Sequence, residues 1–468
     1  MTNRGRLSLI ALGACALLLA IATAWIARVD VRSDVEGFAS RATGLSVAVA
    51  GQASLGLLPT LHVTLKDVTA SNGGSRVAAI GEANIGLALW PLLRGHVRVN
   101  RVLLKDLTLD IERTPSGRFN FTVERPDEGG APALSLPRLV LVNATVRYVN
   151  QQADGEIRAS GCAVESDDVQ LSAGPGSLMT RLSLTGEGRC ESLRSERFLG
   201  TDVRWSMMGA DGRFELSPVT LLAMSGEGTG RIEAVFSQAV PTYRLRYAVN
   251  RLKLDDLFRS LATGKQSTGF LDLTLDLTLR GSNAAELTRT MQGEVSLRGE
   301  NLAVPIGDLD EKLKRYESSQ NFNLVDLGAF FVAGPLGTAV TKGYDFAGVF
   351  RETEGNTVIR RLLSQWRVAE GVAHATDVAF VTQQNRLALK GNLDFVRGTF
   401  EDVTVAVLDE QGCATIEQKI RGPFKAPEIV KPNVIASLAG PFSNAIRGAG
   451  RIVGVKCDVF YAGSIPPG

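Results

Sequence analysis

The segment 270–280 constrains the fold more than any other part of this sequence. It reads FLDLTLDLTLR, and from its first leucine onward apolar and polar residues alternate at every position. Because successive side chains of a β-strand point to opposite faces of a sheet, one face receives only leucines. These residues are Leu271, Leu273, Leu275, Leu277 and Leu279. A strand with one apolar and one solvated face is typical of an antiparallel sheet.

Weaker alternation recurs along the chain, and turn-forming residues separate the alternating stretches. These stretches lie at 103–111, 139–149, 295–297, 387–395 and 403–407. Asn-Gly and Asp-Gly pairs between stretches favour hairpin turns. The sequence therefore predicts a mostly β body. Helices are expected only at 30–43, 308–318 and 434–453, and the last of these either packs on the sheet or lies at a membrane surface.

A faint repeat underlies the N-terminal part of the chain. LKDVT at 65–69 returns 39 residues later as LKDLT at 104–108, and 37 residues after that in a decayed form as LVNAT at 141–145. A related piece is EDVT at 401–404, and two glycine-bearing segments, TGEG at 185–188 and SGEG at 225–228, are 40 residues apart. Chance recurrence of common strand residues is the simpler explanation. The constant spacing favours a repeated strand unit stacked along one direction.

The N-terminal segment indicates where the chain works. Arg4 and Arg6 precede the run 7–26, which contains no charged residue. As a helix this run would span about 30 Å, close to the thickness of a bilayer core. Since the two arginines lie before the run, the positive-inside rule leaves the N-terminus in the cytoplasm and exports the rest of the chain.

A membrane anchor and a cleaved signal peptide are the two interpretations of this run. Ala22-Thr23-Ala24 is an acceptable cleavage site, but the run is long for a signal peptide. Trp25 lies where an interfacial aromatic residue is expected. We therefore expect a retained anchor, with these residues in it: Leu7, Leu17, Trp25 and Ile26.

Cysteine usage agrees with export. Four of the five cysteines, Cys162, Cys190, Cys413 and Cys457, follow the apolar run. An even number after an export signal indicates disulfides formed in an oxidising compartment. Three pairings are possible, and the short-range one, Cys162–Cys190 with Cys413–Cys457, avoids linking distant parts of the chain. No spacing typical of a zinc site is present.

The sequence lacks the motifs that enzymes of this size carry. Its three histidines lie in strand-like stretches, and it contains neither a GxSxG motif nor a P-loop. Asp308 and Asp310 could be metal ligands on paper, but solvated turn positions explain them better. With 51 basic and 49 acidic residues and no basic block, nucleic acid is a poor candidate partner. We expect no enzymatic activity, no cofactor and no metal.

The order of several loose motifs resembles one protein family. After the N-terminal run come LLP at 57–59, LKDV at 65–68, WPLLRG at 90–95 and GRFNF at 117–121. Near the C-terminus follow GNLDF at 391–395, GC at 412–413, GPF at 422–424 and CDVFYAG at 457–463. This order resembles the AsmA family of bacterial envelope proteins, over about residues 1–150 and 290–463.

The resemblance implies an inner-membrane anchor and a periplasmic body built as a curved sheet. In such proteins the sheet resembles the sheet of chorein-type lipid-transfer proteins. It forms an open trough whose inner surface is apolar. It also implies a disulfide between Cys413 and Cys457. The expected segments are a tail and anchor at 1–28, an AsmA-like β region at 29–150, central repeats at 151–290 and a C-terminal AsmA-like region with helices at 291–468.

A lipid-handling function follows from this resemblance and from the strand pattern. An apolar sheet face must be covered by a second sheet, a helix or a ligand, and this sequence offers few helices. We expect the five leucines of 271–279 to line a groove for phospholipid acyl chains. A closed β-sandwich without ligand is the structural alternative. An envelope assembly factor, acting with other envelope proteins and carrying no lipid, is the functional alternative.

Overall fold

The structure is a computed structural model that describes residues 32–314, 355–430 and 458–467. Short gaps within these ranges fall at 57–59, 95, 97, 123–132, 152–154, 175, 196–197, 261–265, 306, 312 and 425. Strands dominate the described residues and the helices are short, so the mostly β prediction is confirmed. The chain divides into two units, unit 1 (Met1–Glu196 with Thr201–Ser217) and unit 2 (Arg197–Gly200 with Pro218–Gly468). The four expected segment boundaries stay a prediction.

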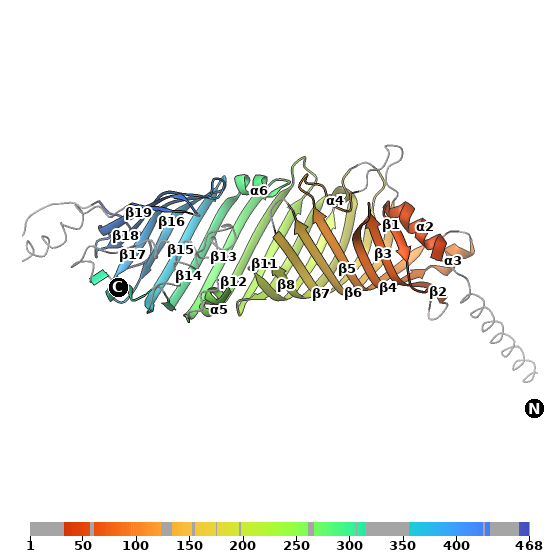
Figure 1. Cartoon of the computed structure of the whole chain (residues 1–468), viewed down its shortest axis with the longest axis horizontal. Coiled ribbons are helices and arrows are strands. Elements are labelled where there is room, and N and C mark those ends of the chain that lie inside the picture. Colours follow the sequence, from red (N-terminus) through yellow and green to blue (C-terminus); the bar gives the residue numbers. More distant parts are fainter. Residues whose placement is uncertain are drawn as a thin grey trace, which may run out of the picture. The chain divides into compact units, whose positions relative to one another are not determined.

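The described part of unit 1 contains three helices and the first strands, which follow one another in Figure 1. The helices are α2 (Arg32–Thr43), α3 (Leu89–Leu93) and α4 (Leu178–Arg181). The strands are β1 (Ser46–Val49), β2 (Ala53–Gly56), β3 (His62–Asn72), β4 (Ser75–Leu87), β5 (Val99–Arg113), β6 (Leu134–Asn150), β7 (Gly155–Leu171) and β8 (Leu182–Ser195). Two further strands, β9 (Leu199–Ala210) and β10 (Arg213–Ala223), have residues in both units.

The described residues of unit 2 include short helices and the remaining strands. Two of these helices are α5 (Leu254–Ser260) and α6 (Ala284–Thr290). The strands are β11 (Gly226–Val235), β12 (Thr242–Lys253), β13 (Thr268–Arg280), β14 (Gln292–Val304), β15 (Thr357–Ala369), β16 (Val372–Val381), β17 (Arg386–Asp394), β18 (Thr399–Leu408), β19 (Ala414–Pro423) and β20 (Glu428–Ile429).

Neighbouring strands pair antiparallel within each unit, with one exception in unit 1. β5 and β6 are parallel, with Leu104 aligned on Leu141 and Thr108 on Thr145. A parallel pair needs a crossover connection, and residues 114–133 provide one. The strand pairs are antiparallel, as expected, except at this pair.

The sequence repeat has a structural counterpart at this parallel pair. LKDLT at 104–108 and LVNAT at 141–145 lie side by side in register, as a stacked repeat requires. The third residue of every copy has a left-handed backbone: φ is 54° at Asp67, 54° at Asp106 and 55° at Asn143. Asp and Asn tolerate this conformation better than other non-glycine residues. The Asn143 Nδ2 donates a 2.6 Å hydrogen bond to Asp106 Oδ1, which links two copies.

Two of the left-handed aspartate and asparagine residues lie in β-bulges. The register shifts across Asn143 on β6 and across Asp402 on β18, which has φ 48°. At Asp106 the register is unshifted, because Ile80 aligns with Leu107 and Glu82 with Lys105. Asp106 faces Gly81, where a Cβ would lie 3.1 Å from the Asp106 Cβ. Since bulges increase local twist, the positions of Asn143 and Asp402 are places where the strands bend.

The three expected helices have different outcomes. The first is confirmed as α2, whose Ser40 Oγ accepts a 3.0 Å hydrogen bond from the backbone N of Val47 and so fixes the helix along β1. The second begins at Leu309 and is described only to Lys314. The third, at 434–453, lies outside the described residues.

Unit 2 holds the main hydrophobic core, and part of its sheet is covered on both faces. Alternate residues of β16–β18 enter two separate clusters. Phe380, Leu387 and Val405 belong to the larger one, while Ala388 and Ala406 belong to the smaller one. The smaller cluster is closed by residues 458–467. Tyr461 donates a 2.5 Å hydrogen bond to Asp377 and Ile465 accepts one from Arg386, so this distant segment is fixed onto the sheet.

Candidate functional site

An apolar row crosses the strands of unit 1 and is its best candidate for a functional surface. Backbone register aligns one residue from each of six strands, and paired residues share a face of the sheet. The aligned residues are Leu65, Ala83, Leu104, Leu141, Val164 and Gly188. We call this set the unit 1 row. It contains the leading leucines of all three repeat copies.

Burial changes along the unit 1 row. Leu65 and Ala83 are buried in a small cluster with Val63 and Val68. From β5 onward, Leu104, Leu141 and Val164 are only partly buried. The apolar face is thus well covered at one end of the row and partly open to solvent at the other.

The leucines predicted to line a groove do share one face, in unit 2. Leu275 aligns with Tyr247 on β12 and Val295 on β14, and Val295 aligns with Trp366 on β15. Gly230 on β11 aligns with Tyr247 and extends the row to five strands. We call these five residues the unit 2 row. The predicted alternation of β13 is therefore confirmed, whereas a lipid groove stays a prediction.

Burial also changes along the unit 2 row. Val295 and Trp366 are each 1% exposed and lie in the main core. Leu275 is only partly buried, as are three of the other predicted leucines, Leu273, Leu277 and Leu279. Leu271 differs from them, because it is 1% exposed. Four of the five predicted residues therefore lie where the apolar face is incompletely covered.

Aromatic rings fill the space above glycines in both units, a feature that the sequence analysis missed. In unit 1, a Cβ on Gly188 would lie 2.4 Å from the Trp205 ring. In unit 2, a Cβ on Gly228 would lie 2.6 Å from the Tyr247 hydroxyl. These are the last glycines of the TGEG and SGEG segments. The sequence analysis found the spacing of these two segments but not the aromatic residue that covers each glycine.

The Tyr247 hydroxyl lies in an apolar environment. It is buried and has no hydrogen-bond partner among the described residues. Burial raises the pKa of Tyr247 to about 12, since the phenolate would be poorly solvated. The tyrosine therefore acts as an apolar ring at neutral pH.

The opposite face of each sheet is charged. In unit 1 the Lys105 ammonium lies 2.8 Å from the Glu82 carboxylate. In unit 2 Arg244 and Arg246 approach Asp276 at 3.7 and 3.6 Å. The first pair is partly buried and the second is exposed. Such solvent-accessible pairs contribute little stability, but they show which face is solvated.

A disulfide joins Cys162 on β7 to Cys190 on β8 in unit 1, which confirms this predicted pair. Both residues are buried. Cys413 is also disulfide-bonded. Cys457 lies outside the described residues, so the pair Cys413–Cys457 stays a prediction.

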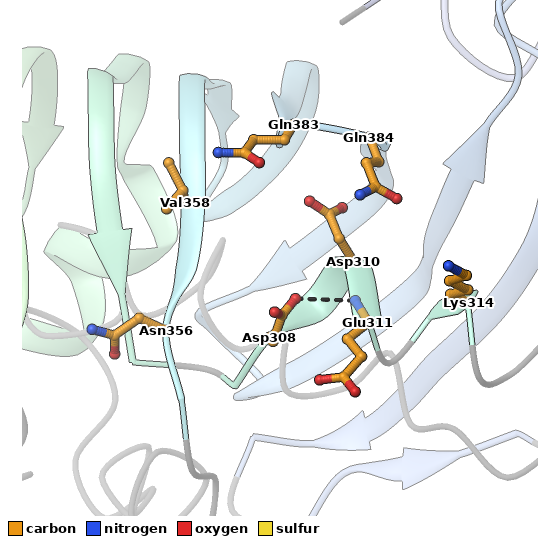
Figure 2. A pocket seen from close by; sticks show the side chains of 8 residues that line it. All are labelled: Asp308, Asp310, Glu311, Lys314, Asn356, Val358, Gln383 and Gln384. Atoms are coloured by element: carbon orange, nitrogen blue, oxygen red, sulfur yellow. Dashed lines mark hydrogen bonds between the residues drawn. The ribbon is translucent and has the colours of Figure 1, made fainter.

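The aspartates considered as metal ligands line a polar pocket of about 260 Å³ in unit 2. Figure 2 shows the Asp308 carboxylate accepting a 3.0 Å hydrogen bond from the backbone N of Glu311. Asp310 accepts from Thr382 Oγ1 and Asn385 Nδ2, each at 2.6 Å. The Asp308 carboxylate caps the helix that begins at Leu309, and the Asp310 carboxylate holds the turn that contains Thr382 and Asn385. Across the part of the chain that the structure describes, no group of acidic, Cys or His residues has the geometry of a metal site.

The expected membrane anchor cannot be compared with the structure. Residues 1–31, including Leu7, Leu17, Trp25 and Ile26, lie outside the described part of the chain. Within residues 32–467, as far as they are described, no helix is both long and apolar enough to span a membrane.

Comparison with known proteins supports the recognition made from the motifs. Residues 1–171 match the model of the AsmA family. The AsmA resemblance is thereby confirmed for this part of the chain. The AsmA match ends with the last residue of β7 and includes the unit 1 row up to Val164. No curated protein and no solved structure is significantly similar to the chain.

Proposed function

We propose that this protein binds lipid and shelters phospholipid acyl chains against the partly covered apolar faces of its sheet. The observation that carries the proposal is the unit 2 row, in which burial decreases from Trp366 to Leu275 along one continuous apolar surface. Water-exposed apolar area is unfavourable by about 25 cal/mol per Å², so such a surface is a natural contact for acyl chains.

The AsmA match supports placing this activity in the bacterial envelope. In our proposal the run 7–26 holds the protein at the inner membrane, with the N-terminus in the cytoplasm and the body in the periplasm. The Cys162–Cys190 disulfide fits an oxidising compartment of this kind. Lipid moves or is retained there by binding alone, for transport or for maintenance of the outer membrane.

The test compares three aspartate substitutions on β13, made in the full chain and purified in detergent. Leu275→Asp introduces a charge on the partly covered face, where the sheet can hydrate around it. We expect a folded protein with less bound lipid, because a carboxylate facing acyl chains is costly to desolvate. Native mass spectrometry and lipid extraction measure the lipid, and thermal unfolding measures the fold.

Two matched controls separate lipid binding from stability. Thr274→Asp lies on the exposed, opposite face of the same strand and should change neither lipid content nor unfolding. Leu271→Asp places the same charge where the side chain is 1% exposed and should unfold unit 2. A folded wild type that contains no lipid would contradict the proposal and favour the assembly factor instead.

A further inference from the structure

The connection between β4 and β5 presents large apolar side chains to solvent. It contains α3, the five residues LWPLL. Trp90 is 73% exposed, more than any other large apolar side chain among the described residues, and the adjacent Leu89 is 55% exposed. Exposed apolar side chains that lie together mark interaction surfaces more often than they mark poor folding.

The backbone of this connection is hydrogen-bonded, so the two side chains are held outward by an ordered turn. The Ala88 N donates to the Arg98 carbonyl oxygen at 2.9 Å and closes the base of the connection. The amides of Arg94 and His96 both donate to the carbonyl oxygen of Pro91, at 3.0 and 2.9 Å.

The charged residues that flank α3 in the sequence are all basic. Between residues 86 and 105 the sequence GLALWPLLRGHVRVNRVLLK contains Arg94, Arg98, Arg101 and Lys105 and no acidic residue. The three arginines are exposed. Exposed Trp and Leu next to a cluster of arginines match the chemistry of the interface of an anionic bilayer, where the aromatic ring sits among headgroups and the cations face lipid phosphates.

The end of the β2–β3 connection lies beside the start of the β4–β5 connection. The Leu87 N donates a 2.8 Å hydrogen bond to the carbonyl oxygen of Leu61. The β2–β3 connection has the sequence LLPTL at 57–61, again without charge.

The N-terminus of α2 points toward the same end of unit 1. Arg32 donates to the Gly51 carbonyl oxygen at 2.7 Å, and Glu36 accepts from the Val49 N at 2.6 Å. The helix therefore runs antiparallel to β1, and its N-terminus faces the end of the sheet where β2 meets β3. Figure 1 shows α2 and α3 at this same end of unit 1.

We propose that α3 is a membrane-contact element, which inserts Trp90 and Leu89 into the interface of an anionic lipid bilayer while Arg94, Arg98 and Arg101 bind its phosphates. This contact is distinct from any lipid carried on the apolar rows. It makes the end of unit 1 that bears α3 the end that faces the membrane.

The experiment uses the full chain reconstituted in vesicles of phosphatidylethanolamine and phosphatidylglycerol, some with acyl chains brominated near the headgroup. Bromine quenches tryptophan emission only at contact distance, so the difference between wild type and Trp90→Phe isolates Trp90. We expect Trp90 emission to be quenched by brominated lipid. Because Trp90 is 73% exposed, Trp90→Phe should fold and melt like wild type.

A charge variant tests the role of the arginines. Arg94→Gln with Arg98→Gln should reduce Trp90 quenching, since each basic residue near an anionic surface strengthens association by about fivefold. The same variant should show little further change in vesicles of phosphatidylcholine.

Two outcomes would overturn the membrane contact. One is equal quenching of wild type and Trp90→Phe. The other is Trp90 emission that brominated lipid leaves unchanged but that shifts with protein concentration, which would assign α3 to a second copy of the chain. Both are independent of lipid co-purification and of Leu275→Asp, so this inference and the proposed function fail separately.

Discussion

The two units have the same kind of apolar row but differ in what covers it. In unit 1 the row is buried only at β3 and β4, and Leu104, Leu141 and Val164 stay partly exposed. In unit 2 the row becomes fully buried at Val295 and Trp366, and farther along the sheet both faces are covered. Alternation therefore decides which face is apolar, while coverage depends on other segments.

The difference can be followed in the sequence of the strands. The half-covered strands β5, β6 and β13 alternate apolar and polar residues. The doubly covered strands contain continuous apolar runs, such as VAFV at 378–381 and VAVL at 405–408. A strand buried on both faces needs apolar or small residues at every position. A strand whose apolar and polar residues stop alternating is thus expected to be covered on both faces.

The largest expected effect on stability lies at the fully buried end of the unit 2 row. Trp366→Ala removes a fully buried ring and its 2.8 Å hydrogen bond to Ser364, and should destabilise unit 2 by about 3–5 kcal/mol. Leu141→Ala, on the partly exposed part of the unit 1 row, should cost only about 1–2 kcal/mol. Chemical denaturation of both variants gives the two values. Equal losses would show that the two rows are equally covered.

Removal of the disulfide should affect one unit only. The bond closes a 28-residue separation in unit 1, and the double variant Cys162→Ala with Cys190→Ala should destabilise that unit by about 3 to 4 kcal/mol on the chain-entropy model. Hydrogen exchange should rise in β7 and β8 and stay unchanged in β17 and β18. A loss of protection that extends equally to β17 would contradict separate units.

The left-handed residues of the repeat offer a smaller effect. Asp106 has φ 54°, a backbone that a β-branched residue adopts poorly, so Asp106→Val should cost about 1–2 kcal/mol. Asp106→Gly is the matched control, because glycine accepts this backbone but also loses the hydrogen bond from Asn143. A Gly variant that is as unstable as the Val variant would place the effect in the lost hydrogen bond.

The sequence predicted local features better than long-range ones. The period-two pattern of β13 and helix α2 depend on neighbouring residues, and both are found in the structure. The repeat predicted that copies stack, and two of them do, but the parallel direction of the β5–β6 pair that brings them together depends on a long crossover. The second covering of β16–β18 depends on residues 458–467, and the ring over Gly228 belongs to the following strand, Tyr247. A linear pattern does not specify such partners.

The smallest expected effect concerns Tyr247, in the half-covered part of the unit 2 row. Its buried hydroxyl has no hydrogen-bond partner among the described residues, so Tyr247→Phe should be stabilising, by about 1 kcal/mol, because the phenylalanine ring still covers Gly228 without an unsatisfied polar atom.

The pH dependence of stability gives an independent check on Tyr247. Since the pKa of Tyr247 is raised to about 12, its contribution to stability is complete below about pH 10 and is lost as the pH rises toward 12. Burial also raises the pKa values of Tyr243 and Tyr461, so the variant should retain part of this alkaline loss. Denaturant melts from neutral pH to pH 12 measure both effects. If the variant is less stable than wild type and loses stability equally at high pH, the hydroxyl is solvated, and the unit 2 row is more open at β12 than the structure indicates.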